Sequence, residues 1–568
     1  PSAALALLCG SAAAMVVWKW LGKRQIQKKM EEAQRTRDEG VKKMAKAVQQ
    51  FREQVSNVQT DAILSLPLLE LTGRLREGSL SPKTVLYTYV EKALEVTQQT
   101  NCLRHFIPEC EEQLQEIQQQ REKGLLYGIP VSIKDHISHK GHLSTCGLVQ
   151  CLGTPVQEDS VLVKVLKSQG AIPFAMTNVP QSLFNYDCSN PIFGQTLNPF
   201  NHQKSPGGSS GGEGALIAGG GSILGIGSDI GGSIRLPSSF CGLCGLKPTA
   251  ERLSVWCTCL LNIDVCSHPT PVPCALGPMA RDVDSLALCM KALLCQEMFQ
   301  LDPTVPPIPF DEEVYSSSAP LRVGYYDTDG YFPLPPCMRR AVRDTRGALQ
   351  AAGHQLVPFS PPRIHYVMTE LFLKTFFADG GHAWLDVFTG NIIDPSLKPQ
   401  VNCCKIPRLG KKLLALILKP LLKNVPTIST CRSVKEMWNH HHQIEAYRTE
   451  FITQWRELQL DVVLCPVLGP AFTSGYPGKL LTAISSTMLY NVLNFPAGVV
   501  PVSTVTEADE EELKHYRGCC DDPWDRTLKQ AVAGAVGLPV AVQCVALPWQ
   551  EELCLRFMKE VETLSREK

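Results

Sequence analysis

A glycine- and serine-rich segment over residues 205–245 constrains the fold of this chain more than any other feature of its sequence. The glycines alternate with apolar stretches at 215–218 and 223–226. A flexible linker is polar throughout, so these stretches exclude a linker and require burial. Glycine among buried residues indicates a close backbone approach or an unusual φ angle. We therefore expect this segment to be a tightly packed part of a core.

From about Thr60 onward, short apolar runs alternate with helical patterns. Strands are predicted at 128–133, 171–176, 461–465 and 538–543, and helices at 85–96 and 161–170. Such alternation predicts a layered α/β fold over residues 59–568.

Composition excludes some classes of protein. The 568 residues include 55 Lys and Arg and 55 Asp and Glu, and a neutral chain argues against a nucleic-acid partner. The 23 cysteines are odd in number and irregularly spaced. A long chain of this kind does not resemble a secreted disulfide framework, so buried thiols in a reducing compartment are predicted.

The N-terminus carries a first membrane signal. Residues 4–17 are uncharged, and Trp18 and Trp20 suit a membrane interface. Positive charge follows the apolar run instead of preceding it, which favours a transmembrane anchor at 1–20 over a cleaved signal peptide or a buried helix. Residues 19–46 contain ten Lys and Arg against four acidic residues, so the positive-inside rule predicts a catalytic domain facing the cytoplasm. Residues 21–58 are expected to form a basic juxtamembrane helix, which either grazes the membrane or is a charged spacer.

A second membrane signal lies late in the chain. Residues 407–425 are rich in leucine with interspersed lysines, and Pro420 interrupts them. The stretch is too broken to span a bilayer, and it fits a helical cap lying on the membrane surface. The alternative is a core helix with snorkelling lysines.

Two short motifs in the glycine-rich segment point to other chemistry. A phosphate-binding loop requires Gly-Lys-Ser or Gly-Lys-Thr at its end, which the segment lacks. Residues 207–211 match the nucleophile elbow Gly-x-Ser-x-Gly, but polar and proline-flanked residues precede them where an elbow needs a buried strand. An elbow-type esterase using Ser209 therefore stays a secondary alternative.

The whole stretch 205–249 resembles the signature of the amidase signature family. It has the Gly-Gly-Ser-Ser-Gly-Gly opening, the Asp-Ile-Gly-Gly-Ser-Ile-Arg centre and the Gly-Leu-Lys-Pro-Thr close. An upstream lysine lies in the matching context 128–135. Further stretches at 188–191, 277–282, 494–501 and 537–557 look like the membrane-bound branch of this family that hydrolyses fatty acid amides. The resemblance implies a central twisted mixed β-sheet covered by helices on both faces, with an N-terminal transmembrane helix.

The resemblance also implies the roles of site residues. Ser233 would attack the amide carbonyl, Lys134 would act as base, and Ser209 would pass the proton to the leaving amine. A lysine can act as base only when it is neutral, which burial favours. The backbone N–H groups of Ile230, Gly231, Gly232 and Ser233 would bind the oxyanion. Ser210 would support the site by hydrogen bonding, and Arg235 is expected to pair with Asp229.

The implied substrates are N-acylethanolamines and primary fatty amides. Candidate residues for binding the substrate or its acyl chain are Leu183, Phe184, Tyr186 and Phe377. No cofactor and no metal are implied, and His136, His139 and His142 are expected to be ordinary loop residues. The implied partners are a lipid amide, the bilayer of the endoplasmic reticulum or another endomembrane, and a second copy of the chain in a homodimer.

Residues 255–274 depart from the family pattern. A Gly- and Ser-rich stretch is expected there, and the chain has cysteines and prolines instead. Their spacing matches no standard zinc site. Because the departure borders the signature, a catalytically impaired family member is the second alternative.

Overall fold

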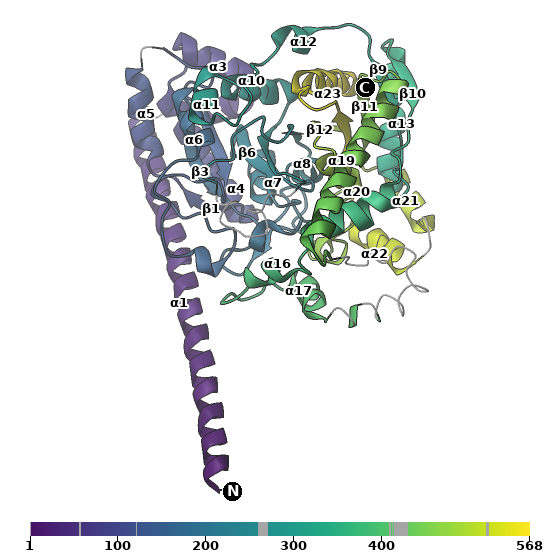
Figure 1. Cartoon of the computed structure of the whole chain (residues 1–568). Coiled ribbons are helices and arrows are strands. Elements are labelled where there is room, and N and C mark those ends of the chain that lie inside the picture. The colour runs from purple at the N-terminus through teal and green to yellow at the C-terminus, as the bar shows by residue number, and fades with distance from the viewer. Residues whose placement is uncertain are drawn as a thin grey trace.

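The computed structural model describes residues 2–55, 58–120, 122–258, 271–407, 410–411, 413, 430–518 and 522–567. The side chains of residues 2–16, 18 and 19 are outside this description. One layered α/β body holds the sheet, and α1 (Ser2–Gln54) runs along it and projects beyond it toward the N-terminus (Figure 1).

A mixed sheet of eleven strands forms the centre of the body. Its order is β1 (Leu103–Phe106), β3 (Ile172–Thr177), β2 (Pro130–Lys134), β6 (Leu224–Asp229), β8 (Ala275–Ala280), β7 (Cys244–Lys247), β12 (Ala497–Thr504), β13 (Pro539–Val545), β11 (Val462–Pro466), β9 (Arg322–Tyr325) and β10 (Gln355–Pro358). A separate hairpin pairs β4 (Ser189–Asn190) with β5 (Gly194–Gln195). The four predicted strands are β2, β3, β11 and β13, so these predictions are confirmed within two residues at each end.

Helices pack around the sheet (Figure 1). In the first half of the chain they are α2 (Thr60–Leu64), α3 (Leu68–Glu77), α4 (Pro82–Thr100), α5 (Cys110–Gln119), α6 (Val161–Ser168), α7 (Gly211–Ala218) and α8 (Arg235–Cys241). In the second half they are α10 (Val283–Leu293), α11 (Gln296–Leu301), α12 (Glu312–Ser316), α13 (Pro336–Ala351), α14 (Ile364–Tyr366), α15 (Leu373–Phe376), α16 (His382–Asp386), α17 (Lys398–Lys405), α19 (Val434–Glu457), α20 (Ser485–Val492), α21 (Glu507–His515), α22 (Pro523–Val532) and α23 (Glu551–Arg566). A π-helix over Val367–Phe372 joins α14 to α15.

Local sequence explains where several helices begin. The side chain of Ser81 accepts a hydrogen bond from the N–H of Thr84, and Pro82 occupies the first turn of α4, where a missing N–H costs nothing. Ser160 caps α6 in the same way. The predicted helices at 85–96 and 161–170 therefore correspond to α4 and α6.

The core lies on both faces of the sheet and includes many cysteine side chains. Every cysteine in the described part of the chain is a free thiol, and most of these thiols are buried. This agrees with the thiols predicted from composition. The strands at the centre of the sheet, including β2, β3 and β6, are buried along their whole length.

Strand direction brings the ends of β2 and β6 to one edge. β2 pairs in parallel with β3 on one side and with β6 on the other. Ile133 lies opposite Ile226, so the residues that follow each strand emerge side by side. The carboxyl edge of parallel strands is where α/β folds bind ligands.

The helix α1 attaches to the body through its middle part. Met30 is buried among Val149, Leu152, Ile192 and Phe193. The Gln34 side chain donates to the Ile192 carbonyl at 2.6 Å. These contacts hold the basic segment against the loop that follows β2 and against the turn between β4 and β5.

The two membrane predictions concern segments whose side chains lie largely outside the description. Across the part that is described, we find no helix with enough length and apolar character to cross a membrane, so the predicted N-terminal transmembrane helix has no support there. Most side chains of the anchor at 1–20, and residues 408–409, 412 and 414–429 of the predicted cap, are outside the description. The same holds for 259–270 in the departing stretch.

Candidate active site

Lys134 is the last residue of β2 and is completely buried. Its Nζ donates to the hydroxyl oxygen of Ser209 at 2.7 Å and to that of Ser228 at 2.9 Å. Burial lowers the pKa of Lys134 from its ordinary value to about 8, because the low-dielectric interior disfavours the ammonium form. A minor fraction of this amine is therefore neutral near physiological pH, whereas an amine at its ordinary pKa of 10.5 would be almost fully protonated.

Ser209 lies in a tight loop that precedes α7. Gly207 has a φ angle of +79°, and a Cβ there would meet the Cα of Pro237 at 2.7 Å, so only glycine fits. The peptide bond between Gly208 and Ser209 is cis. No strand lies between Gln195 and Gly211, all of which is described, so the loop lacks the context of a nucleophile elbow.

Ser210 connects this loop to the loop after β6. Its backbone N–H donates to the carbonyl of Ser233 at 3.1 Å. Its hydroxyl accepts a 3.4 Å hydrogen bond from the N–H of Ser228. Ser210 therefore brings the residues around Ser209 and Ser233 next to each other.

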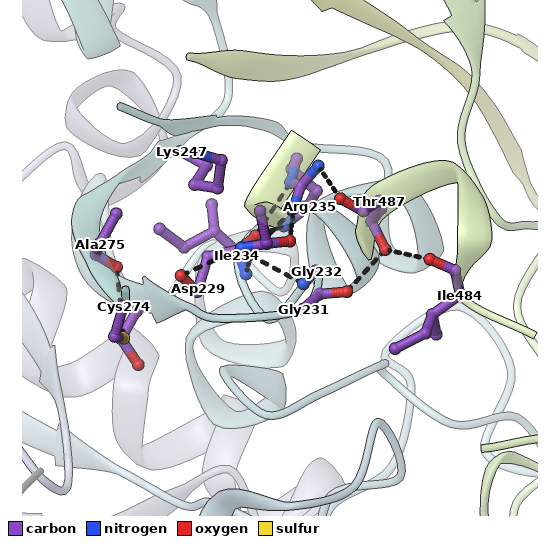
Figure 2. A network of polar contacts seen from close by, with 12 residues as sticks. Asp229, Gly231, Gly232, Ile234, Arg235, Lys247, Cys274, Ala275, Ile484 and Thr487 are labelled. Atoms are coloured by element: carbon purple, nitrogen blue, oxygen red, sulfur yellow. Dashed lines mark hydrogen bonds and ion pairs between the residues drawn. The ribbon is translucent and has the colours of Figure 1, made fainter. Parts of the chain in front are cut away.

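Asp229 organises the loop that carries Ser233 (Figure 2). Its carboxylate accepts from the N–H of Gly232 at 2.7 Å and from the N–H of Ile234 at 3.1 Å. Gly232 has a φ angle of +132°, and a Cβ there would lie 2.5 Å from Oγ1 of Thr487. The Thr487 hydroxyl donates to the Gly231 carbonyl at 2.7 Å.

This geometry corrects one sequence-based expectation. The single N–H of Gly232 is used by Asp229, so it is not available to an oxyanion in this arrangement. Within the described residues we find no acceptor for the N–H groups of Ile230, Gly231 or Ser233. These three remain the candidate oxyanion donors.

Arg235 pairs with Asp229, as expected from the sequence. Its Nη2 lies 3.0 Å from Oδ1 of Asp229, and both side chains are fully buried. The guanidinium also donates to the side chain of Gln543 at 2.8 Å and to that of Asn491 at 2.6 Å. The charge of Arg235 holds the pKa of Asp229 well below its usual range despite burial, so the carboxylate stays charged and its hydrogen bonds persist.

Ser233 lines an apolar cavity beside these loops. Fourteen residues surround it: Leu183, Phe184, Asn185, Tyr186, Gly208, Ile230, Gly231, Ser233, Leu236, Phe372, Phe376, Leu481, Ile484 and Met488. Ser233 is only partly buried, whereas Ser209 is 2% exposed and bonded to Lys134. Ser233 is therefore the more accessible of the two hydroxyls.

The predicted acyl-channel residues divide into two groups. Leu183, Phe184 and Tyr186 line the cavity. Phe377 does not, and lies behind Phe184, with ring centroids 5.9 Å apart in an edge-to-face arrangement. The cavity instead uses Phe372 and Phe376, which the sequence reading missed.

The three histidines after Lys134 lie in a loop and are buried. His142 Nε2 is 2.8 Å from the carboxylate of Glu109, and its ring lies edge-to-face with that of His139. Within the described residues, no group of three metal-ligating side chains is found.

Comparisons with known proteins agree with the sequence motifs. Residues 84–555 match the protein family described as "Amidase". The chain is 52% identical to "Fatty-acid amide hydrolase 1" of Sus scrofa over 563 residues, covering 99% of this chain and 96% of that one. It is 60% identical to "Vitamin D3 hydroxylase-associated protein" of Gallus gallus over 445 residues, covering 78% of this chain and 95% of that one.

Solved structures show the same architecture. One titled "Fatty acid amide hydrolase" matches with a TM-score of 0.80 at 25% identity and covers 96% of both chains. Another, titled "Crystal structure of amidase", matches with a TM-score of 0.61 at 22% identity over 88% of this chain and 99% of that one. The latter likeness bears on the fold alone.

Proposed function

Because the chain belongs to the amidase family, we propose that it is a membrane-bound serine hydrolase that cleaves fatty acid amides to a fatty acid and an amine. One observation carries this proposal: an apolar cavity lined by Ser233 adjoins a buried lysine bonded to Ser209. The substrates would be fatty acid amides, in line with the names of the similar hydrolases from Sus scrofa and Caenorhabditis elegans. N-acylethanolamines and primary fatty amides are the classes we expect among them.

The proposed reaction begins with Ser233. Its hydroxyl attacks the amide carbonyl while its proton passes through the Ser209 hydroxyl to the neutral amine of Lys134. The negative oxygen that forms is stabilised by the N–H groups of Ile230, Gly231 and Ser233. Asp229 holds the neighbouring N–H groups of Gly232 and Ile234 and so fixes the loop that carries these donors, which limits the reorganisation that accompanies the attack.

The second half of the reaction returns the proton. Lys134 gives it back through Ser209 to the amine nitrogen, and the carbon–nitrogen bond breaks. The acyl group remains as an ester on Ser233, and water then releases the fatty acid by the same proton route. Amide cleavage needs the protonation of the amine nitrogen, because an unprotonated amine is a poor leaving group.

We expect long acyl chains to be preferred. Each methylene buried in an apolar cavity contributes about 0.8 kcal/mol, so kcat/KM should rise steeply from short to long amides. Phe184→Ala should lower kcat/KM for an eighteen-carbon amide by about tenfold or more, the usual effect of one lost apolar contact, with little effect on a four-carbon amide. Steady-state hydrolysis of an amide series measures both effects.

The matched control is Phe200→Ala, because Phe200 is 55% exposed and is not among the residues that line the cavity. It should leave the chain-length preference unchanged. A flat dependence on chain length in the unsubstituted protein would rule out a fatty acid amide as the substrate while leaving amidase activity itself intact.

The membrane part of the proposal rests on residues 1–20 and 407–425. The full chain should float with both neutral and anionic vesicles in a density gradient. A chain lacking residues 1–20 should float mainly with anionic vesicles, because basic amphipathic surfaces depend on acidic lipid headgroups. Recovery of the full chain at the bottom of both gradients contradicts membrane binding.

Homodimer formation, a cytoplasmic catalytic domain and location in the endoplasmic reticulum or another endomembrane stay predictions.

A further inference from the structure

A base lysine stays neutral only if no uncompensated negative charge lies near it. Six other titratable groups face Lys134 from the elements packed around it: His136, Cys146, Cys188, Glu213, Asp229 and Cys274. Burial keeps most of them uncharged. It raises the pKa of Cys188 to about 12 and that of Cys274 to about 11, and it raises the pKa of Glu213 to about 8.

Burial also lowers the pKa of His136 well below its ordinary value, so its imidazole is neutral. The pKa of Asp229 is instead held well below its usual range by Arg235, so Asp229 is charged, and Arg235 compensates it at 3.0 Å. One more carboxylate remains to be accounted for. It belongs to Asp135, the residue directly after Lys134.

Asp135 is completely buried and has its own arginine. The Arg104 Nε lies 2.9 Å from Oδ1 of Asp135, and the Arg104 side chain is 5% exposed. Arg104 comes from β1, two strands away from β2 in the sheet. Its Nη2 also donates to the Leu143 carbonyl at 2.5 Å.

The other carboxylate oxygen of Asp135 holds a loop. It accepts from the N–H of Thr145 at 2.8 Å, from the Thr145 hydroxyl at 2.9 Å and from the N–H of Cys146 at 2.6 Å. The Cys146 carbonyl accepts from the N–H of Ser182 at 2.8 Å. Leu183, the next residue, lines the cavity beside Ser233.

We propose that Arg104 and Asp135 are positioning residues of the active site. Their ion pair fixes the strand end that presents Lys134 and the loop that leads to Leu183, and it prevents the Asp135 carboxylate from favouring a charged Lys134. The inference rests on the proposed function, because it assigns the pair a role only if Lys134 is the base. The expected effect of the pair is on the pKa of Lys134, and loss of packing alone would not shift that pKa in opposite directions in the two variants.

The test uses two single variants and their combination. Arg104→Met leaves the Asp135 carboxylate unpaired. Its negative charge then favours the ammonium form of Lys134, so the acid limb of the kcat/KM profile should move up by about one pH unit. Asp135→Asn keeps an acceptor for Thr145 and Cys146 but leaves the guanidinium unpaired. Its acid limb should move down by about one pH unit, because a like charge disfavours the ammonium form of Lys134.

The double variant Arg104→Met/Asp135→Asn should return the acid limb to its original place. Arg340→Met is the control. It removes the ion pair in which Nη2 of Arg340, on α13, lies 2.7 Å from Oδ2 of Asp509, on α21, and neither residue belongs to the site. It should not move the limb. If Arg104→Met yields no folded protein, Asp135→Asn still gives its own signed result.

Shifts of both single variants in the same direction, or no shift in either, overturn the inference. Failure of the proposed function gives a different result. In that case a fluorophosphonate fails to label Ser233 in the unsubstituted protein, whatever the variants do.

Discussion

Replacing Ser233 by alanine should reduce kcat/KM for a fatty amide by at least about 10⁴-fold, because removal of the nucleophile of a serine hydrolase leaves only binding and oxyanion stabilisation. The fold should be unaffected, since no hydrogen bond from the Ser233 hydroxyl occurs among the described residues and the residue is only partly buried. Hydrolysis of a long-chain amide and the midpoint of thermal unfolding measure the two expectations.

A fluorophosphonate probe gives the same test a covalent readout. It should label the unsubstituted protein, and peptide mapping should place the adduct on Ser233. Ser233→Ala should lose the label, while Ser565→Ala, a change near the end of α23, should keep it. An adduct on Ser209 would instead support an elbow-type esterase, and folded protein without any adduct would support an impaired family member.

The sequence allows Lys134 and Ser233 to be placed together because both lie at strand ends that share one edge of the sheet, while their chemical roles stay predictions. Lys134 ends a buried apolar run, and the loop with Ser233 directly follows β6, the parallel neighbour of that strand. The pairing of Asp229 with Arg235 could also be predicted from the sequence, because the two residues lie six positions apart around a single tight turn.

The far wall of the cavity was not predictable in the same way. Phe372 and Phe376 lie in a run of apolar residues whose helical phase the sequence leaves open. The π-helix at 367–372 adds a residue per turn and shifts which side chains face the cavity. As a result Phe376 lines it, while the predicted Phe377 lies behind Phe184.

Backbone hydrogen bonding and distant ion pairs were also beyond the sequence. The direction of the Gly232 N–H depends on Asp229 and on Thr487, which is over 250 positions away along the chain. Arg104 lies in a short strand where an arginine has no local partner, and only the sheet order brings it to Asp135. Contacts of this kind arise from tertiary packing and leave no mark in local periodicity.

Lys134→Met should separate catalysis from stability. The folded protein holds the pKa of Lys134 at about 8 against an ordinary 10.5, so at neutral pH the buried amine destabilises the fold by about 3 kcal/mol. Methionine removes this cost but leaves the hydroxyls of Ser209 and Ser228 without their donor, at about 1 kcal/mol each. The variant should therefore be more stable than the unsubstituted protein by about 1 kcal/mol at pH 7.

The sign of this difference should reverse at higher pH. Between pH 8 and 10.5 the unfolded chain binds the lysine proton and the folded chain does not, so the unsubstituted protein gains stability as pH rises through this window. Above it, the Met variant should be the less stable of the two by about 2 kcal/mol, the value of the lost hydrogen bonds. Urea denaturation of both proteins at pH 7, 9 and 11 measures their free energies of unfolding and locates the pH at which the two values are equal.

Activity should respond in the opposite sense. In the unsubstituted protein kcat/KM should rise with pH and level off above about 8, because only the neutral amine accepts a proton. Lys134→Met should lose about 10³-fold or more at pH 7, the usual value of a positioned base, together with the inflection near pH 8. A variant that becomes more stable at pH 7 while losing activity cannot owe that loss to unfolding.

Lys204→Met supplies the matched control, because Lys204 is also buried and burial lowers its pKa to about 8. Its Nζ donates to the Ala533 carbonyl at 2.6 Å, and Lys204 is not among the residues that line the cavity, so it takes no part in the proposed proton route. It should show a similar dependence of stability on pH with kcat/KM preserved. If both lysine variants lost activity equally, the loss would not depend on the position of Lys134. That result would contradict the role of Lys134 as the base.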